Sequence, residues 1–435
     1  MKKIILQLLI LAISVLSLPA SAIPSFSRQT GIDCQACHAQ HMPILNDFGQ
    51  SFKASGYRTM GTQSRIESDS LSIPESLNAS MLIISRYQRS NGGDAPGTLP
   101  GTTTNGGQWQ FPDDFDLFLG GRISNNFGFY FEGNTASPTL LSAFKLPAAI
   151  EVNQYNLSVI PYLTDRFGAS YGYEQASTGA VQNMVWAEHR KEVSAQQYVG
   201  TDGAATGVSI VAKNDTGYLN FSRWAPASQA KSGYAQVLHS NYLRVAVTPK
   251  FDSLDHGEWA LLIGAQFWTG SNFAQNAAKN LVPVNTQATA LDFQAMGTVN
   301  DKDIMLYATL AKSPSGTAAK PNMLNVGSTV SDVYDPAEYR LNERTAFTVG
   351  VDYSVIQNTL HVGAAYRSAK TGGRTGLLAV SGGNPSDNAI TLTAVYNLAQ
   401  NIELHANHSY YYGSLYDTPQ PRGNLLTTIK LQAAW

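Results

Sequence analysis

The sequence predicts an all-β transmembrane barrel of the outer-membrane type, with about 16 antiparallel strands and a small α-helical unit ahead of them. Three observations favour this fold class: an export signal at the N-terminus, a short helical pattern after it, and apolar and polar side chains that alternate from about residue 77 to the end. Charged residues make up 14% of the 435 residues and the net charge is -2. No basic surface therefore points to a nucleic-acid partner.

The first residues have the pattern of a signal peptide, residues 1–22. Lys2 and Lys3 precede an apolar run from residue 4 to 18, and Ala20 and Ala22 supply the small residues that signal peptidase needs. The mature chain is then expected to begin near Ile23, in a protein exported to the outer membrane of a Gram-negative cell. An uncleaved anchor is the alternative, but the run is shorter than the roughly 20 residues of a membrane span.

The only two cysteines of the chain lie in one C-x-x-C-H motif, Cys34-Gln35-Ala36-Cys37-His38. This spacing lets both thiols form thioethers with the vinyl groups of one haem, while the adjacent His38 gives the iron its proximal imidazole. A local disulfide, a redox pair and half of a zinc site are the alternatives. A redox pair would require a βαβ context, and a zinc site would require a second cysteine pair. The sequence has neither. The motif predicts one covalently attached haem c.

A short amphipathic helix and a turn are expected to complete a monohaem cytochrome c unit, residues 23–70, that plugs the barrel. Apolar side chains at helical spacing share one face: Ile44, Leu45, Phe48 and Phe52. Gly56 is expected to end this helix. The stripe alone would fit a helix that packs on any apolar surface equally well.

A sixth ligand for the iron is expected from a nearby side chain. Met60 follows the helix and the turn, so it has enough chain to reach the distal face, where a Met/His pair would raise the reduction potential. His41 is the second choice, because it lies only three residues beyond His38 and would share its side of the ring. Met42 has the same problem. An open or water-ligated iron is the remaining alternative.

The rest of the chain, residues 75–435, has the two-residue alternation of barrel strands. Phe347 and Val349, for example, alternate with Thr348, which gives one apolar and one polar face between lipid and a wet lumen. An even strand number suits a single-chain barrel with both ends on the periplasmic side. The sixteen predicted strands begin near residues 77, 113, 126, 150, 167, 207, 216, 241, 258, 290, 303, 345, 358, 389, 401 and 425.

The connections and the last strand support the barrel. Tight turns such as Asn125-Asn126 and Asn300-Asp301 alternate with long polar connections such as residues 91–108 and 313–344. The chain ends on Trp435, and a final amphipathic strand with a terminal aromatic resembles the signal by which outer-membrane barrels are inserted. A soluble β-sandwich or propeller is the alternative, but no propeller-type repeat is found.

Few barrel residues are candidates for catalysis or metal binding. His405 and His408 look like a metal pair, but their odd separation on a strand places them on opposite faces. Asp113, Asp114 and Asp116 would either attract a cation at the barrel mouth or form an ordinary loop rim.

Residues 25–57 contain a characteristic series of elements: Phe26-x-Arg28-Gln29-Thr30-Gly31, Cys34-x-x-Cys37-His38, Pro43, Phe48-Gly49, Phe52-Lys53 and Gly56-Tyr57. In these elements the segment resembles the N-terminal part of the fused outer-membrane cytochrome c–porins of iron-oxidising bacteria (the Cyc2-like family). The resemblance implies an electron conduit in outer-membrane lipid, in which extracellular Fe(II) gives electrons to one haem c and a periplasmic c-type cytochrome accepts them. It implies haem attachment at Cys34, Cys37 and His38 and assigns no residue to Fe(II).

The expected function is therefore outer-membrane electron transfer, and an enzymatic activity, if the chain has one, would be that of an Fe(II)-oxidising cytochrome. Two alternatives stay open. A diffusion porin that carries a haem unit would pass solutes whatever the redox state of the iron. A haem-dependent redox enzyme would need an open sixth position and distal acid–base groups, for which His41 is the only nearby histidine.

Overall fold

The computed structural model describes fourteen stretches of the chain, and the signal peptide expected at residues 1–22 lies outside them, as do His41 and Met42. The α-helices are α2 (Ser25–Thr30), α3 (Asp47–Ala54) and α5 (Ala195–Val199). None of the helices in the described stretches is long and apolar enough to cross a membrane. These stretches are residues 25–39, 45–61, 63–69, 71–93, 105–135, 141–174, 194–227, 237–252, 258–276, 280–325, 333–334, 340–373, 383–420 and 423–435.

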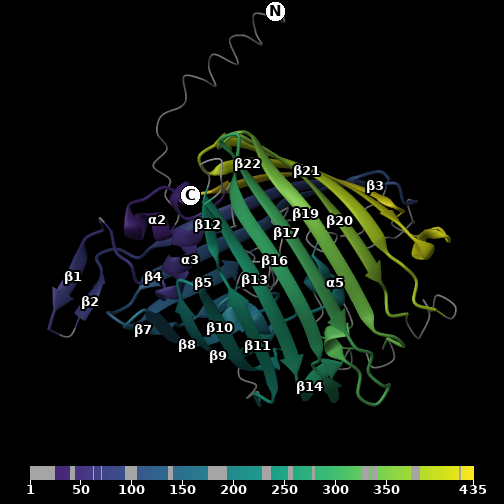
Figure 1. The fold of residues 1–435 in the computed structure, drawn as a ribbon, viewed down its shortest axis with the longest axis horizontal. Helices are drawn as coiled ribbons and strands as arrows, with labels where there is room; N and C mark the ends of the chain where they lie inside the picture. The colour runs from purple at the N-terminus through teal and green to yellow at the C-terminus, as the bar shows by residue number, and fades with distance from the viewer. Residues whose placement is uncertain are drawn as a thin grey trace, which may run out of the picture.

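A closed barrel of sixteen antiparallel strands forms the body of the protein (Figure 1). Two of these strands are broken, since β6 and β7 share the partner β8, and β11 and β12 share β13. The breaks fall at Pro147 and Pro249, because a proline has no N–H to give to the ladder.

The bounds of the strands in the ring follow in chain order. They are β3 (Ala79–Ser90), β4 (Gln108–Arg122), β5 (Gly128–Asn134), β6 (Leu141–Lys145), β7 (Ala148–Val152), β8 (Tyr155–Thr164), β9 (Ala205–Asn214), β10 (Gly217–Pro226), β11 (Ser240–Val247), β12 (Lys250–Asp252), β13 (Glu258–Thr269), β16 (Ala288–Val299), β17 (Lys302–Ser313), β19 (Arg344–Ile356), β20 (Leu360–Lys370), β21 (Asn388–Ala399), β22 (Ile402–Tyr412) and β23 (Leu425–Ala434).

Two small sheets lie outside this ring. The hairpin of β1 (Arg65–Ser68) and β2 (Leu71–Pro74) projects away from the barrel beside the helical unit (Figure 1). The second sheet joins β14 (Ser271–Asn276), β15 (Leu281–Asn285) and β18 (Val333–Tyr334) among the connections at the other end of the barrel. Neither sheet contributes a strand to the barrel wall.

The last strand closes the ring against the first. β23 pairs with β3, and beyond the strand the backbone N–H and C=O of Trp435 bond to Met81 at 3.0 and 2.8 Å. The closed ring has no exposed strand edge. Such an edge is not tolerated in a membrane, because its backbone groups would have no hydrogen-bond partners. The strand predicted to begin near residue 425 is confirmed as β23, and it completes the barrel.

Short turns gather at the end of the barrel that holds both chain ends. The turn between β16 and β17 has Asn300 and Asp301 at φ values of 52° and 57°, as in a tight hairpin turn. At the opposite end the connections are long, such as residues 165–204 and 314–343. Outer-membrane barrels keep short turns in the periplasm and long loops outside. The N-terminal helices therefore lie at the periplasmic end, beside the C-terminus (Figure 1).

One predicted strand is wrong. The expected strand near residue 167 is a 3-10 turn, η2 (Ala169–Gly172), which is buried inside the barrel. The strand that belongs to this part of the wall is β8, which ends at Thr164. The other fifteen expected starts lie within five residues of an observed strand of the ring.

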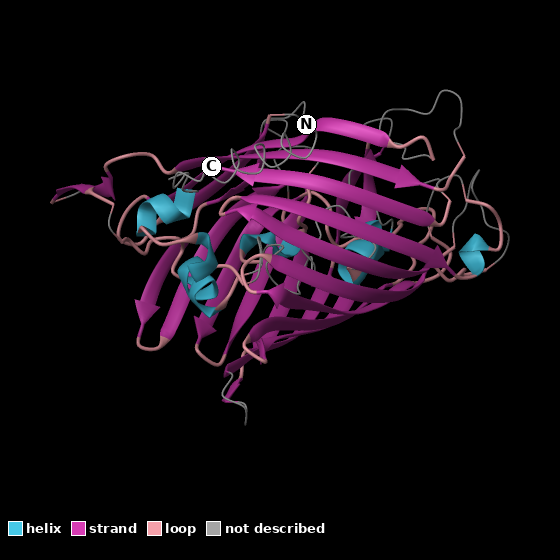
Figure 2. Cartoon of the chain, turned by 90° about the horizontal axis from the view of Figure 1, so that it is seen from above, coloured by secondary structure: helices cyan, strands magenta, loops and turns pink. Residues whose placement is uncertain are grey.

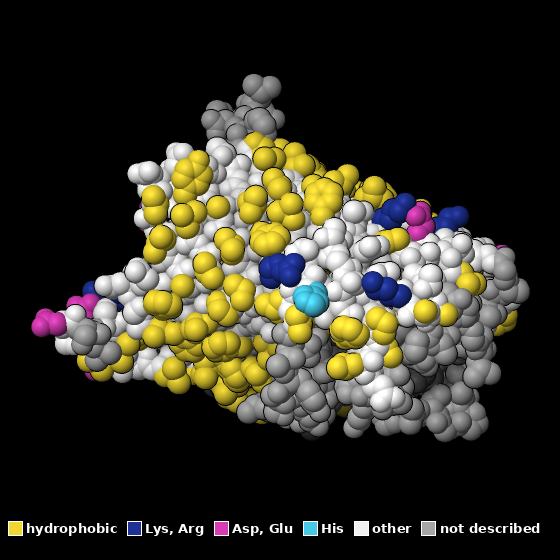
Figure 3. Space-filling view, turned by 90° about the horizontal axis from the view of Figure 1, so that it is seen from below, with side chains coloured by type: hydrophobic (Ala, Val, Ile, Leu, Met, Phe, Trp, Pro, Cys, Tyr) yellow, Lys and Arg dark blue, Asp and Glu magenta, His cyan; other side chains and the backbone are white. Residues whose placement is uncertain are grey.

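The two faces of the wall differ in polarity. On β19, Phe347 and Val349 are 39% and 40% exposed on the outer face, whereas Thr348 and Asp352 are fully buried on the inner one. His405 is buried and His408 is exposed, so the two lie on opposite faces as predicted. Hydrophobic side chains cover much of the outer face that Figure 3 presents, with few charges among them. An apolar outside and a polar inside place this barrel in an outer membrane.

The inside of the barrel is filled on two levels. Helices α2 and α3 occupy the periplasmic end, where Phe26 of α2 approaches Gly120 of β4 and Ala54 of α3 packs with Ile160 of β8. Further in, the connection after β8 folds into the lumen: η2 packs on β8, β9 and β10, and α5 packs on β17 and β19. Figure 2 shows helical segments at one end of the barrel and others between its strands.

Candidate functional site

The C-x-x-C-H motif forms one compact turn. Cys34–Ala36 is the 3-10 turn η1, and the carbonyl of Cys34 accepts hydrogen bonds from the N–H groups of Cys37 (3.1 Å) and His38 (2.9 Å). This closed turn brings Cys34, Cys37 and His38 to the wall of a single cavity. The structure thus unites the three residues that the sequence assigned to one haem.

Asn46 and Gly49 hold helix α3 against this turn. The Asn46 side chain accepts a bond from Gly49 N–H at 3.0 Å as the N-cap of α3, and its Nδ2 donates to the carbonyl of Ala36 at 3.0 Å. The Asn46 N–H donates to the carbonyl of Cys37, also at 3.0 Å. A Cβ on Gly49 would lie 2.3 Å from the carbonyl oxygen of Cys37, so only glycine permits this approach.

The expected amphipathic stripe is only partly realised. Helix α3 begins at Asp47, so Leu45 precedes it, and Ile44 lies outside the described residues. Phe52 is buried, but Phe48 is 45% exposed and faces away from the cavity lining. The predicted end of the helix is confirmed, because Gly56 has a φ of 72° two residues after Ala54, the last helical residue.

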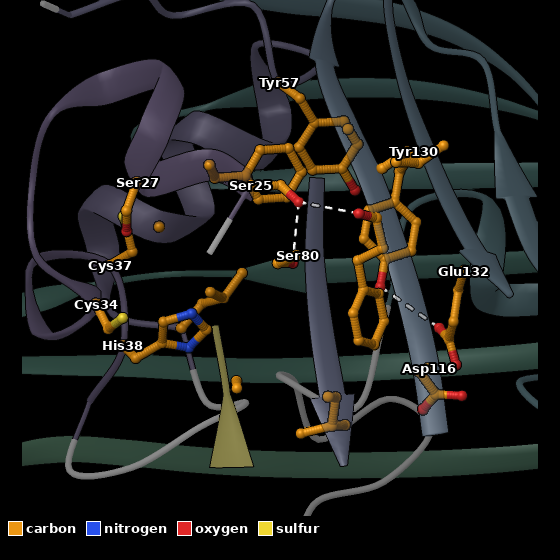
Figure 4. Close-up of a pocket in the computed structure, with 18 of the residues that line it drawn as sticks. Ser25, Ser27, Cys34, Cys37, His38, Tyr57, Ser80, Asp116, Tyr130 and Glu132 are labelled. Carbon is orange, nitrogen blue, oxygen red and sulfur yellow. Dashed lines mark hydrogen bonds between the residues drawn. The ribbon is translucent and has the colours of Figure 1, made fainter. Parts of the chain in front are cut away.

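The cavity has a volume of about 300 Å³ and lies between the helical unit and the inner face of the barrel wall. Figure 4 shows Cys34, Cys37 and His38 on one side, with Tyr130, Glu132 and Asp116 opposite. This volume lies at the lower end of the range for cofactor and ligand pockets, about 300–1,000 Å³. The apolar and aromatic lining side chains are Phe26, Leu45, Phe52, Tyr57, Leu82, Ile84, Phe118, Leu119, Tyr130, Phe167, Tyr171 and Ala434.

An aromatic cluster fixes α2 over the cavity. The ring of Phe26 stacks on Tyr57, with centroids 5.0 Å apart and planes 11° apart, and meets the edge of Phe52 at 5.1 Å. Tyr130 of β5 lies 6.2 Å from Phe26, which joins the cluster to the barrel wall. Such contacts add about 0.5–1.5 kcal/mol each beyond burial.

Polar bonds fix the same helix in position. Gln29 is fully buried, and its Nε2 donates to the carbonyls of Tyr57 (2.7 Å) and Thr59 (2.8 Å). Its Oε1 accepts from the N–H of Arg122 on β4 at 3.0 Å. One amide therefore joins α2, the segment after α3, and the barrel wall.

Lys53 links α3 to the connection that folds into the lumen. Its Nζ lies 3.9 Å from Glu174 and 4.5 Å from the ring centre of Tyr173. Burial lowers the pKa of Lys53 to about 8, against the opposing attraction of Glu174. Glu174 is held at 3.1 Å by Arg244 on β11, so the contact continues into the wall.

Burial disfavours the thiolate form of both cysteines. Burial raises the pKa of Cys34 and of Cys37 above the ordinary thiol value, whereas catalytic C-x-x-C pairs have a lowered pKa. Cys34 Sγ also lies 3.5 Å from Oδ1 of Asn401 in the turn between β21 and β22. A thiol–disulfide exchange site is therefore disfavoured.

The residues present fit a covalently attached haem. Two thiols and one imidazole line a mostly apolar cavity, which is the donor set and the surroundings of a c-type haem. A zinc site would need four ligands. In the described stretches no group of three or more His, Cys, Asp or Glu side chains is arranged to hold a metal ion.

The structure does not bring Met60 to the cavity. Met60 lies before Gly61, whose N–H donates to the carbonyl of Gln29 at 3.1 Å, and it is not among the side chains of the cavity wall. His41 and Met42 lie within residues 40–44, outside the described stretches. The distal ligand remains a prediction.

Sequence reasoning singled out Asp114 and Asp116 but did not join them to the motif, and it gave no role in the site to Tyr130 and Glu132. Tyr130, Glu132 and Asp116 reach the cavity from the wall, and Asp114 and Asp116 stand on strand β4 inside the lumen rather than on a loop rim. The signal was present, because these polar residues occupy inward positions of alternating strands. Their nearness to the cysteines depends on how the helical unit enters the barrel, which a local pattern does not encode.

Comparison with known proteins adds the following. No protein-family model matches the chain, and no curated protein is similar to it. Among solved structures it is similar to the outer membrane channel DcaP of Acinetobacter baumannii, with 12% identity over 86% of this chain and 100% of that one and a TM-score of 0.48. OmpF of Salmonella typhi and OmpT of Vibrio cholerae show the same identity and coverage, with TM-scores of 0.47 and 0.44.

Proposed function

We propose that this protein is an outer-membrane electron-transfer cytochrome, in which a porin-like barrel holds one haem c on its N-terminal helical unit. The observation that carries the proposal is the shared cavity of Cys34, Cys37 and His38, enclosed between α3 and the inner wall of the barrel. A C-x-x-C-H motif on an unrelated surface segment would not be expected to line an apolar cavity of this kind.

The roles of the chain's residues follow from their positions. Cys34 and Cys37 would hold the haem by thioethers, and His38 would give the proximal nitrogen. Asn46 keeps the motif turn closed and fixed to α3 through its three hydrogen bonds. The aromatic cluster of Phe26, Phe52, Tyr57 and Tyr130 would exclude water from one side of the ring. When bound, the haem supplies a one-electron carrier.

The barrel would provide the route through an insulating layer. The hydrocarbon core is about 30 Å thick, so an electron does not cross it without a carrier within the membrane. The helical unit sits at the periplasmic end, where a soluble c-type cytochrome can approach. We propose extracellular Fe(II) as the donor: each Fe²⁺ would lose one electron and become Fe³⁺, and the electron would pass through the haem to that cytochrome.

A diffusion porin is the second candidate, favoured by the architecture, since a closed sixteen-stranded barrel with an apolar exterior is the frame of a channel. The two occupied levels of its lumen oppose free diffusion. Conductance across planar bilayers separates the two functions: a porin would pass ions in large steps whether the haem is oxidised or reduced.

The deciding experiment mixes the purified, oxidised holoprotein with Fe²⁺ without oxygen and follows the haem absorption bands by stopped flow. The reduced spectrum should appear rapidly in the wild type and not in His38→Ala. His408→Ala, which changes an exposed histidine on the outer face of β22, is the matched control and should behave as the wild type. A haem that dithionite reduces but Fe²⁺ does not would exclude iron as the donor.

A further inference from the structure

We propose that Asp116, with Asp114 or Glu132 beside it, binds one divalent cation inside the barrel, and these three residues are here called the acidic cluster. The three carboxylates line the same cavity as the C-x-x-C-H motif, but from the barrel wall. Asp114 and Asp116 stand on β4, and Glu132 stands on β5 opposite Phe118. Figure 4 shows Asp116 and Glu132 across the cavity from the cysteines.

Asp116 is the residue that points to a ligand. It is 1% exposed, and within the described part of the chain its Oδ1 has no hydrogen-bond partner. A buried carboxylate without a partner costs free energy unless it is neutralised or meets a cation. Asp113, its neighbour in sequence, differs, because it pairs with Arg86 at 2.5 Å and does not line the cavity.

The local charge balance favours a cation. Arg166 faces the acidic cluster and already lies 2.8 Å from Glu132, 3.7 Å from Asp114 and 3.9 Å from Asp165. One guanidinium therefore stands against four carboxylates when Asp116 is included. The two lysines of the cavity wall have their own contacts, Lys53 with Glu174 and Lys430 with Gln432 at 2.8 Å.

The donor set selects the class of ligand. Carboxylate oxygens suit hard divalent cations, and such ions are held by one or two carboxylates with water completing the shell. The described residues contain no preformed cage of three protein ligands, so the site would be open and exchangeable. An open oxygen site fits a cation that must arrive and leave rather than a permanent structural ion.

The position of the cluster gives it a place in the proposed function, on which this part of the inference rests. Along β4, Gly120 and Gly121 meet Phe26 and Gln29 of the helical unit. Asp116 and Asp114 lie further along the same strand toward the end with long loops, by about 3.3 Å per residue. The carboxylates therefore lie on the long-loop side of the motif, and the cluster would hold Fe²⁺ as the substrate beside the haem.

The test uses Mn²⁺ as the probe with the full-length holoprotein in detergent, and free Mn²⁺ is measured by electron paramagnetic resonance. We expect one Mn²⁺ per chain in the wild type, binding at least tenfold weaker in Asp116→Asn, and near-normal binding in Asp116→Glu. Asp303→Asn is the control, because that carboxylate lies at the start of β17 and accepts a bond from Gln357. If Asp116→Asn does not fold, Glu132→Gln replaces it with the same expectation.

Two results would overturn the site: no Mn²⁺ binding by the wild type at millimolar concentration, or equal binding by Asp116→Asn. Its failure is distinguishable from that of the proposed function. Mn²⁺ bound through Asp116, in a protein whose haem ignores Fe²⁺, would retain the site and reject iron oxidation. Rapid reduction by Fe²⁺ in a wild type that binds no Mn²⁺ would retain the function and reject the site.

Discussion

At the scale of the residue, Asn46 makes several of the hydrogen bonds that join the motif turn to α3. It caps α3, donates to the carbonyl of Ala36 through its side chain and to that of Cys37 through its backbone. The side chain and the backbone N–H of Asn46 therefore fix helix α3 to the motif turn. Nothing in its place in the sequence, nine residues beyond Cys37, marks it as part of the site.

We predict that Asn46→Ala loosens this turn and reduces haem attachment. The loss of one cap and one further hydrogen bond should cost about 1–2 kcal/mol of local stability. Mass spectrometry of the purified chain measures the fraction that carries haem. Asn214→Ala is the matched control, since Asn214 caps the turn between β9 and β10 in a similar way but far from the motif. Equal haem content in the two variants would contradict the role given to Asn46.

At the scale of the element, regular strands could be predicted from the alternation of side chains, whereas irregular segments could not. Pro161 lies inside β8, where a proline argues against a strand, and Ala169 and Tyr171 beyond it mimic the alternation of one. The expected strand was therefore shifted from β8 to the buried turn η2. Local periodicity indicates which side chains share a face. It does not show whether an apolar face contacts lipid or the side chains that fill the inside of the barrel.

The haem unit shows the same limit. Cys34, Cys37 and His38 are predicted as haem residues from spacing alone, because haem c chemistry demands that spacing, and the structure places all three at one cavity. Phe48 could not be placed, because its helical position fits either an apolar wall or solvent. Asp116 and Glu132 could not be joined to the motif, because only the docking of α3 in the barrel brings them to one cavity.

The docking of α3 itself gives a prediction about pH. Lys53 has a pKa lowered to about 8 by burial, against 10.5 as the ordinary value, so between these two pH values the unfolded chain binds the proton that the folded chain has lost. Stability should then rise with pH across this window, by at most about 3 kcal/mol. Below pH 8 both the folded and the unfolded chain hold the proton, so Lys53 no longer makes the stability depend on pH.

Thermal unfolding in detergent between pH 7.5 and 10.5 measures this effect. We expect the melting temperature of the wild type to rise relative to that of Lys53→Met, which has no group to titrate at this position. Lys320→Met, at a half-buried loop position away from α3, should follow the wild type. A wild type that loses stability relative to Lys53→Met as the pH rises would contradict a buried ammonium.

At the scale of the whole molecule, the barrel and its contents have separable tasks. The wall closes through β3 and β23 without any strand from the helical unit, so the unit is an insert rather than a part of the frame. A frame of this kind admits either a channel or an insulated carrier, and the contents decide which. The N-terminal helices and the connection around η2 both lie where a solute would have to pass.

We therefore predict that deletion of residues 25–64 leaves a closed barrel with a several-fold higher ion conductance and without haem. Planar-bilayer recordings measure the conductance, and resistance of the barrel to detergent at room temperature checks that it has closed. The control deletes residues 65–74, the projecting hairpin of β1 and β2. Ser64 and Glu75 already meet through a 2.9 Å backbone hydrogen bond, so a short linker can join them. This control should keep both the haem and the low conductance. A full-length protein that conducts as well as the first deletion would show that the helical unit does not obstruct the lumen, and the insulated conduit would give way to a diffusion porin.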